Sequence, residues 1–110
     1  MAAIFKRLAR NARKLAAIAD YEVALEVVAL RARVPASDLR RRRIWRQGLG
    51  RLKRLAIYLA VMNGHSRRDV ARAAGVSPEL VARYCHHIEE ARDDAGFDRV
   101  LDEMELEMMA

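Results

Sequence analysis

The chain has 110 residues, 53% of them hydrophobic, which is enough for one domain with a buried core. Its net charge of +6 indicates an anionic partner, and its single cysteine, Cys85, excludes an intramolecular disulfide or a site of several thiolates. No apolar run approaches the roughly eighteen residues that span a bilayer, and the first segment mixes charges among its apolar positions. We therefore expect neither a membrane span nor a secretory signal, but a protein of the reducing cytoplasm.

The charge is unevenly distributed along the chain. Residues 1–54 carry +11, residues 55–88 carry +2 and residues 89–110 carry −7. The basic part is expected to attract a polyanion, with nucleic acid as the first candidate. The acidic end has three open roles: it can repel that polyanion, neutralise part of the basic surface internally, or stay solvated.

The composition predicts an all-α fold, because Ala, Leu, Arg and Glu dominate while the chain has only two Pro and five Gly. A basic amphipathic helix is predicted over residues 2–18. Asp20 is a candidate N-cap for a second helix that runs to about Arg33 and ends before Pro35. We divide the chain into this N-terminal helix (1–20), a central domain (21–94) and an acidic C-terminal helix packed on it (95–110).

A short turn capped by Ser37 or Asp38 is predicted to carry Leu39 into the core, followed by a basic loop over residues 40–50. The next helix, from about Gly50 to Asn63, is expected to be the central buried one, because apolar residues cover most of its faces. After the Asn63-Gly64 stop, Ser66 to Asp69 has the form of a capping box.

Two short helices are predicted around Gly75, the first from Ser66 and the second from Ser77-Pro78, which together have the pattern of a helix-turn-helix over residues 66–90. Six further positions meet its packing demands: Val70, Ala71, Ala74, Val76, Val81 and Tyr84. The alternative is a helical hairpin that serves only the core. A last acidic helix is predicted from Phe97 to about Met108, after a break at Ala95-Gly96, with Val100, Leu101 and Met104 as its contact face.

Much of the chain resembles domain IV, the C-terminal DNA-binding domain of the bacterial replication initiator DnaA, a Trp-repressor-like helical fold. The resemblance is carried by Leu25 to Val28, Val34 to Leu39, the arginine loop, Arg54 to Ala60, His65-Ser66, Asp69-Val70, Ala73 to Gly75 and Val81 to Glu89. It implies that the loop reaches the minor groove and backbone, and that the start of the first motif helix contacts phosphate.

The chain departs from that family at two points. The Arg-Asp-His-Thr-Thr segment that reads bases in the family is replaced by Val76-Ser77-Pro78-Glu79-Leu80, and no phosphate loop ending in Gly-Lys-Ser/Thr is present. The resemblance is therefore to a stand-alone domain without the ATPase module, and it does not imply recognition of the initiator's own site.

The candidate DNA contacts fall into three groups. The loop and the start of the central helix supply phosphate contacts: Arg40, Arg41, Arg42, Arg43, Arg46, Arg51 and Lys53. The start of the first motif helix supplies Ser66, Arg67 and Arg68, and the outward face of the second supplies Ser77, Glu79, Arg83, His86 and His87. For the loop, the alternative is a run of charge that is merely solvated.

No metal, cofactor or catalytic site is expected. His86 and His87 are adjacent and point about 100° apart on a helix, so they cannot share one metal ion, and Cys85 lies on the apolar stripe. We therefore expect a small bacterial, nucleoid-associated regulator of transcription or replication that binds double-stranded DNA, without enzymatic activity or a small-molecule substrate. The alternative is an adaptor that binds a protein through the N-terminal helix or the acidic tail, while membrane contact is not expected.

Overall fold

The structure is a computed structural model that describes residues 2–41 and 47–109. Within these ranges the chain forms six helices and no strand, which confirms the predicted all-α fold. The helices are α1 (Ala2–Ala32), α2 (Ala36–Arg40), α3 (Gln47–Met62), α4 (Arg67–Ala74), α5 (Pro78–Ala91) and α6 (Ala95–Met109).

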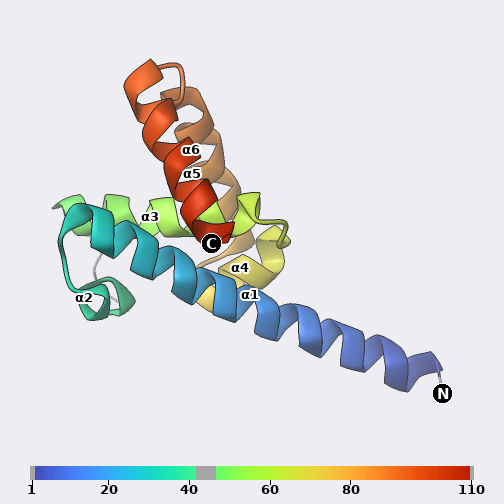
Figure 1. The fold of residues 1–110 in the computed structure, drawn as a ribbon. Coiled ribbons are helices and arrows are strands. Elements are labelled where there is room, and N and C mark those ends of the chain that lie inside the picture. The colour runs from blue at the N-terminus through green and yellow to red at the C-terminus, as the bar shows by residue number, and fades with distance from the viewer. Residues whose placement is uncertain (1, 42–46, 110) are drawn as a thin grey trace.

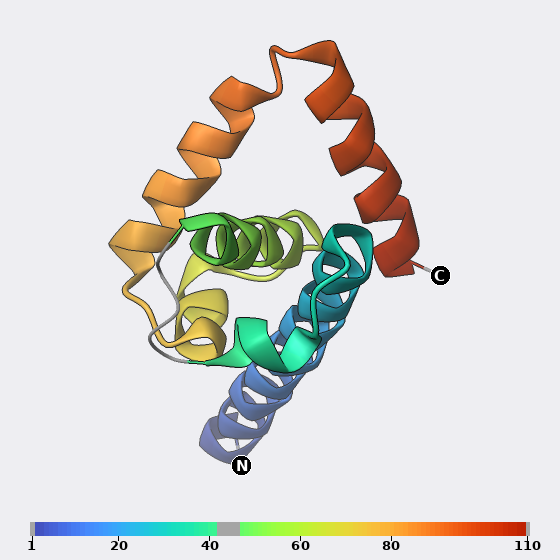
Figure 2. The ribbon, with the colours of Figure 1, turned by 90° about the vertical axis from the view of Figure 1, so that its left-hand side faces the viewer.

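Helix α3 is the centre of the fold, as predicted. Its residues from Ala56 to Ala60 are all at most 1% exposed, and all five other helices contact it. Figure 2 shows α3 nearly end-on, with α5 and α6 to either side and α1 and α4 beneath it. A stretch of helix with five successive buried residues must be covered on all its faces, so this part of α3 fixes where the remaining helices lie.

Helix α1 is one continuous helix, so the prediction of two helices separated by an N-cap at Asp20 is wrong. The Asp20 carboxylate instead accepts a hydrogen bond from Asn63 Nδ2 (2.6 Å) and pairs with the His65 ring, across to the turn after α3. No Pro or Gly lies near Asp20 to stop the helix. A residue that is a good cap locally is thus used for a long-range contact.

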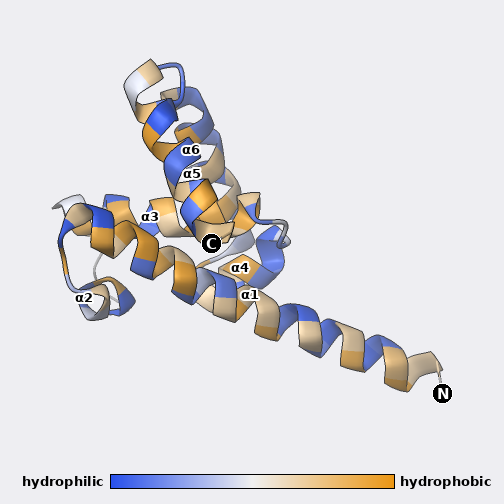
Figure 3. Cartoon of the chain, in the orientation of Figure 1, coloured by the Kyte–Doolittle hydropathy of each residue, from blue (hydrophilic) through white to orange (hydrophobic). Residues whose placement is uncertain are grey.

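The N-terminal half of α1 extends away from the other helices (Figure 1). Every residue from Ala2 to Arg13 is exposed, including Phe5 at 63% and Leu8 at 58%. Figure 3 shows hydrophobic residues recurring along this arm between hydrophilic ones. We call residues 2–16 the N-terminal arm.

Helix α1 ends one residue before Arg33, which adopts a left-handed conformation with φ of 58°. The Val34 amide donates to the Ala29 carbonyl oxygen (3.0 Å), which closes the helix end in a Schellman-type turn. Pro35 then serves as the N-cap residue of α2 without a side-chain hydrogen bond, so the predicted caps Ser37 and Asp38 are wrong. Leu39 is fully buried, as predicted.

Helices α4 and α5 begin and end as the sequence predicts. The Ser66 hydroxyl accepts from the Asp69 amide (3.1 Å), and the Ser77 hydroxyl accepts from the Leu80 amide (3.2 Å). Gly75 ends α4 with φ of 73°, a conformation that a residue without Cβ adopts at little cost. Val70 and Val81 are fully buried, so the two helices contribute to one core.

Helix α6 begins at Ala95, earlier than predicted, so Gly96 lies inside its first turn and not at a break. The reason is Asp94, whose carboxylate accepts from the Phe97 amide (2.9 Å) and caps the helix. Leu101 and Met104 are buried as predicted, but Val100 is 36% exposed, so its assignment to the contact face is wrong.

Helices α5 and α6 form an inverted V (Figure 2), and Arg92 holds its apex together. The Arg92 guanidinium donates to Asp98 (2.5 Å), Glu105 (3.0 Å) and the Tyr58 hydroxyl (2.9 Å), and it also pairs with Asp102. These bonds, first of all the one donated to Asp98, raise the pKa of Arg92. One arginine therefore ties both arms of the V to the central helix.

Because of the Tyr58 hydroxyl, we expect the protein to lose stability at alkaline pH. Burial, reinforced by the hydrogen bond it donates to Glu89, raises the pKa of Tyr58 from its ordinary 10.0 to about 12. The folded state thus holds this proton more tightly than the unfolded chain. The stability that the protonated Tyr58 hydroxyl contributes is fully present below pH 10 and is lost as the pH rises through about 12.

From pH 8 to pH 12, the free energy of unfolding measured with denaturant should therefore fall by roughly 2 kcal/mol more for the wild type than for Tyr58→Phe. Tyr21 titrates in both proteins and cancels in the comparison. An equal loss in the two proteins would contradict the role given to Tyr58.

Candidate nucleic-acid interface

Helix α5 presents one polar face to solvent. Its buried residues are Val81, Cys85 and Ile88, on the side that packs against the rest of the fold. The five residues predicted to read DNA are all exposed: Ser77, Glu79, Arg83, His86 and His87. The division of the helix into an inward apolar stripe and an outward polar face is therefore as predicted.

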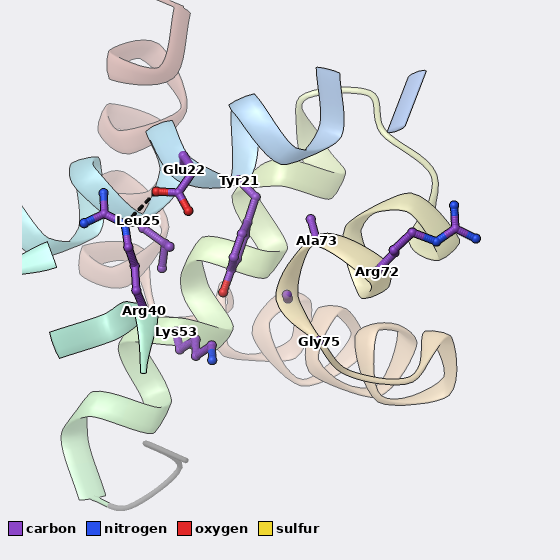
Figure 4. Close-up of a pocket in the computed structure, with 9 residues that line it drawn as sticks. Tyr21, Glu22, Leu25, Arg40, Lys53, Arg72, Ala73 and Gly75 are labelled. Atoms are coloured by element: carbon purple, nitrogen blue, oxygen red, sulfur yellow. Dashed lines mark hydrogen bonds and ion pairs between the residues drawn. The ribbon is translucent and has the colours of Figure 1, made fainter. Parts of the chain in front are cut away.

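The residues on either side of the arginine segment (41–46) border the α4–α5 unit. On one side, Arg40 of α2 and Lys53 of α3 line a cavity together with the end of α4 and Gly75 of the following turn (Figure 4). On the other side, Arg51 of α3 lines a second hollow, of about 400 Å³, with Tyr84 and His87 of α5. Residues before and after the segment thus lie beside the same helix pair.

The segment itself is only partly described. Arg42, Arg43 and Arg46 lie outside the described residues. Arg41 is exposed directly after α2, where its carbonyl oxygen accepts a hydrogen bond from Lys53 Nζ (3.3 Å). Because α3 begins at Gln47 and α2 ends at Arg40, the predicted loop over residues 40–50 is shorter than expected at both ends.

Arg40 is not a free cation, which corrects its prediction as a phosphate contact. Its guanidinium forms ion pairs with Glu22 (2.6 Å) and Glu26 (2.7 Å) of α1. These two carboxylates, Glu22 more than Glu26, raise the pKa of Arg40. The side chain fastens α2 to α1 and is already neutralised by two acids.

Lys53 is the second correction, because only 3% of it is exposed. Burial lowers the pKa of its ammonium group. Spacing in the sequence could have found this, since Lys53 precedes the buried Ile57 by four residues and Ala60 by seven, the spacing of one helix face. Lys53 is therefore a buried residue that donates a hydrogen bond to the Arg41 backbone, and it does not lie on the surface.

At the starts of α4 and α5, the Ser66 and Ser77 hydroxyls are used as caps. Arg67 and Arg68 follow Ser66 and are both exposed. The positive end of the α4 dipole adds to their charge. This helix start has the character expected of a phosphate contact.

The outward face of α5 carries acidic side chains as well as basic ones. His86 Nε2 lies 2.6 Å from Glu90 Oε1, one helical turn later, so this ring has an intramolecular partner. Glu79 is exposed in the first turn. Among the described side chains, no carboxylate forms an ion pair with Arg83 or His87, which makes these two the cationic or donor groups of the face.

The acidic C-terminal helix neutralises two arginines internally, one of the three roles that the sequence left open. Arg31 of α1 pairs with Glu103 and Glu107, both at 2.7 Å, and Arg92 takes three further acids of α6 as described above. Within residues 2–41 and 47–109, no α6 carboxylate pairs with Arg41, Arg51, Arg67 or Arg68. The acids are thus used on another side of the fold.

Two arginines that the sequence analysis omitted also border this region. The Arg54 guanidinium carbon lies 5.0 Å from the centre of the Tyr84 ring, and its Nε is buried without a hydrogen-bond partner. Arg72 is exposed on α4 and lies beside the turn. Helical spacing could have identified both. Arg54 follows Arg51 by three residues and Arg72 follows Arg68 by four, so each lies on the same helix face as a predicted contact.

Three further features concern thiol chemistry, metal binding and membrane insertion. Burial raises the pKa of the Cys85 thiol, which disfavours the reactive thiolate. In the part of the chain that the structure describes, no three His, Cys, Asp or Glu side chains are grouped to hold a metal ion. None of the helices described has the length and apolar character needed to cross a bilayer.

No protein-family model, curated protein or solved structure matches this chain.

Proposed function

We propose that this protein binds double-stranded DNA and acts as a small regulator of transcription or replication. Helix α5 enters the major groove, and the arginine segment that starts at Arg41 contacts the backbone and minor groove. The observation that carries this proposal concerns the residues that flank the segment: Arg40 before it lines a cavity with Gly75 of the α4–α5 turn, and Arg51 beyond it lines a hollow with His87 of α5.

The shape of the α4–α5 unit supports this proposal. Two helices joined by a short turn with a left-handed glycine are the geometry of a helix-turn-helix, in which the first helix supports the second. The outward face of α5 is exposed along its length, and a single α-helix fits the width of the major groove. The resemblance of the sequence to domain IV of DnaA leads to the same assignment.

Electrostatics supports binding more strongly than base recognition. Arg41, Arg51, Arg67 and Arg68 are exposed and have no carboxylate partner among residues 2–41 and 47–109, so they are available to phosphates. The reading face, by contrast, carries Glu79 and the His86–Glu90 pair beside Arg83. We therefore assign most of the affinity to backbone contacts and the base contact chiefly to Arg83.

The backbone contacts predict a steep salt dependence. The logarithm of the affinity for a duplex should fall with the logarithm of the salt concentration, with a slope of about −0.9 for each phosphate neutralised. Replacing Arg41, Arg42, Arg43 and Arg46 by alanine should make this slope shallower by about 0.9 for every contact removed. Fluorescence anisotropy with a labelled duplex measures both slopes.

The quadruple variant must keep the thermal unfolding midpoint of the wild type for this comparison to hold. An unchanged slope in a folded variant would show that the segment does not contact phosphate. Absence of duplex binding by the wild type at low salt would contradict the proposed function itself.

Arg83 and Arg99 offer a matched pair of exposed arginines, one on the outward face of α5 and one on α6. Arg83→Ala should weaken binding to a preferred duplex selected from a random pool by about 1–3 kcal/mol, because a bidentate contact to guanine is lost. Arg99→Ala removes the same charge and should leave the affinity nearly unchanged. Equal losses would mean that only net charge matters and that α5 does not read bases.

The N-terminal arm favours a second function, an adaptor that binds another protein. Ile4, Phe5 and Leu15 are 57%, 63% and 66% exposed, and side chains of this kind are buried in most folded proteins. Deleting residues 2–16 discriminates between the two functions. Retention of duplex binding by the shortened protein supports the α5 interface, whereas a protein that binds no DNA with or without the arm leaves only the adaptor.

A further inference from the structure

The exposed hydrophobic side chains of α1 follow a seven-residue repeat. Five of them recur at alternating intervals of three and four residues: Phe5, Leu8, Ala12, Leu15 and Ala19. This is the spacing of the a and d positions of a heptad, which face the neighbouring helix where two helices pair. We call these five residues the α1 seam.

The charges of the N-terminal arm avoid this seam. Its five cations occupy only the outer heptad positions b, c and f: Lys6, Arg7, Arg10, Arg13 and Lys14. The e and g positions beside the seam are uncharged: Ile4, Ala9, Asn11, Ala16 and Ile18. The face is therefore apolar and without charge across its width. Such a face is self-complementary, whereas a face that carried the cations would repel a copy of itself.

The rest of the fold packs on the opposite side of α1. Ala17 and Tyr21 are buried there. They follow Arg10 and Lys14 by seven residues, nearly two turns, so the packed side of α1 continues the basic side of the arm. The arm itself extends away from the other helices (Figure 1). Two copies can therefore meet along their seams without a collision between the folded parts.

An antiparallel arrangement centred on Ala12 matches the side chains of the two seams. It places Leu8 of each copy against Leu15 of the other. It also places the large Phe5 ring against the small Ala19. Large and small side chains then face each other across the seam, which allows the two helices to interdigitate.

Helix α2 disfavours a parallel arrangement. Parallel helices would lie side by side along all of α1, where Glu22 and Glu26 are the next residues at d and a positions. Arg40 of α2 is bound to both carboxylates, at 2.6 and 2.7 Å, and so lies over this part of the face. The same groups of two copies would meet there. In the antiparallel arrangement the contact ends before Arg40.

We propose that this protein forms a dimer in which the arms of two copies pair antiparallel along the α1 seam. A second copy is the occupant that the charges favour, because the seam carries no cation for an acidic partner to meet. Pairing also stabilises the arm, since residues 2–13 are all exposed in the single chain and a helix of this length is marginal alone. The dimer does not depend on DNA binding.

Sedimentation equilibrium of the full chain without DNA tests the dimer. The wild type should show a concentration-dependent equilibrium between monomer and dimer. Leu8→Gln and Leu15→Gln should each raise the dissociation constant at least about 100-fold, because every dimer then loses two buried leucines. Leu30→Gln is the matched control: Leu30 is 79% exposed on α1 beyond the paired region, and this variant should dimerise as the wild type does.

Leu8 and Leu15 are 58% and 66% exposed in the single chain, so neither substitution removes core packing and both variants should remain folded. A wild type that stays monomeric at millimolar concentration, or seam variants that dimerise as the wild type does, would overturn the pairing. A monomer that binds phosphatidylglycerol vesicles through Leu8 would also overturn it, and would assign the face to a bilayer. A dimer that ignores duplexes contradicts the proposed function and leaves the pairing standing.

Disulfide formation tests the direction of the pairing. In a Cys85→Ala background, Leu8→Cys chains labelled with ¹⁵N are mixed with unlabelled Leu15→Cys chains and oxidised. Mass spectrometry then separates disulfides between like chains from those between unlike chains. The antiparallel arrangement brings positions 8 and 15 together, so disulfides between unlike chains should predominate. Predominance of disulfides between like chains would contradict it.

Discussion

The burial of α3 decides where the other described helices lie. A helix whose residues from Ala56 to Ala60 are shielded on every side has to be enclosed by its neighbours, and all five other helices meet it. Because α3 is packed against α4 and α5, it brings Arg51, near its own start, beside His87 of α5. This part of the candidate interface is thus a consequence of core packing.

The same packing of the helices separates acidic from basic side chains on the surface. Acids of α6 are held by Arg31 and Arg92, and each of these arginines binds at least two carboxylates. This leaves Arg41, Arg51 and Arg67 without an acidic partner among residues 2–41 and 47–109, as a surface that meets a polyanion requires. The net charge of +6 therefore understates the charge that such a partner would meet.

What the sequence predicted correctly depends on neighbours in the chain. Ser66 and Ser77 cap their helices, Gly75 ends α4, and the apolar spacing identified α3 as central, because caps, turns and helical faces are decided within a few residues. The errors came from long-range contacts. Asp20 is bound to the turn after α3 and Arg40 to α1, and no local pattern shows either contact.

The candidate site was predictable in part for the same reason. The outward face of α5 follows from helical spacing and is exposed as predicted, whereas Lys53 was assigned to the surface because its charge outweighed a spacing that marks the inward face. Arg54 and Arg72 were missed because their importance depends on Tyr84 and on the turn beside them, which only the fold brings near.

Mapping the contact surface by NMR is the sharpest test of DNA binding through α5 and the exposed arginines. With the ¹⁵N-labelled protein and a short duplex, the backbone signals of Arg41, Arg51, Arg67 and the α5 face from Ser77 to His87 should shift together, while those of Leu106 and Glu107 on α6 stay in place. Shifts confined to the N-terminal arm, or none at low salt, would contradict this mode of binding.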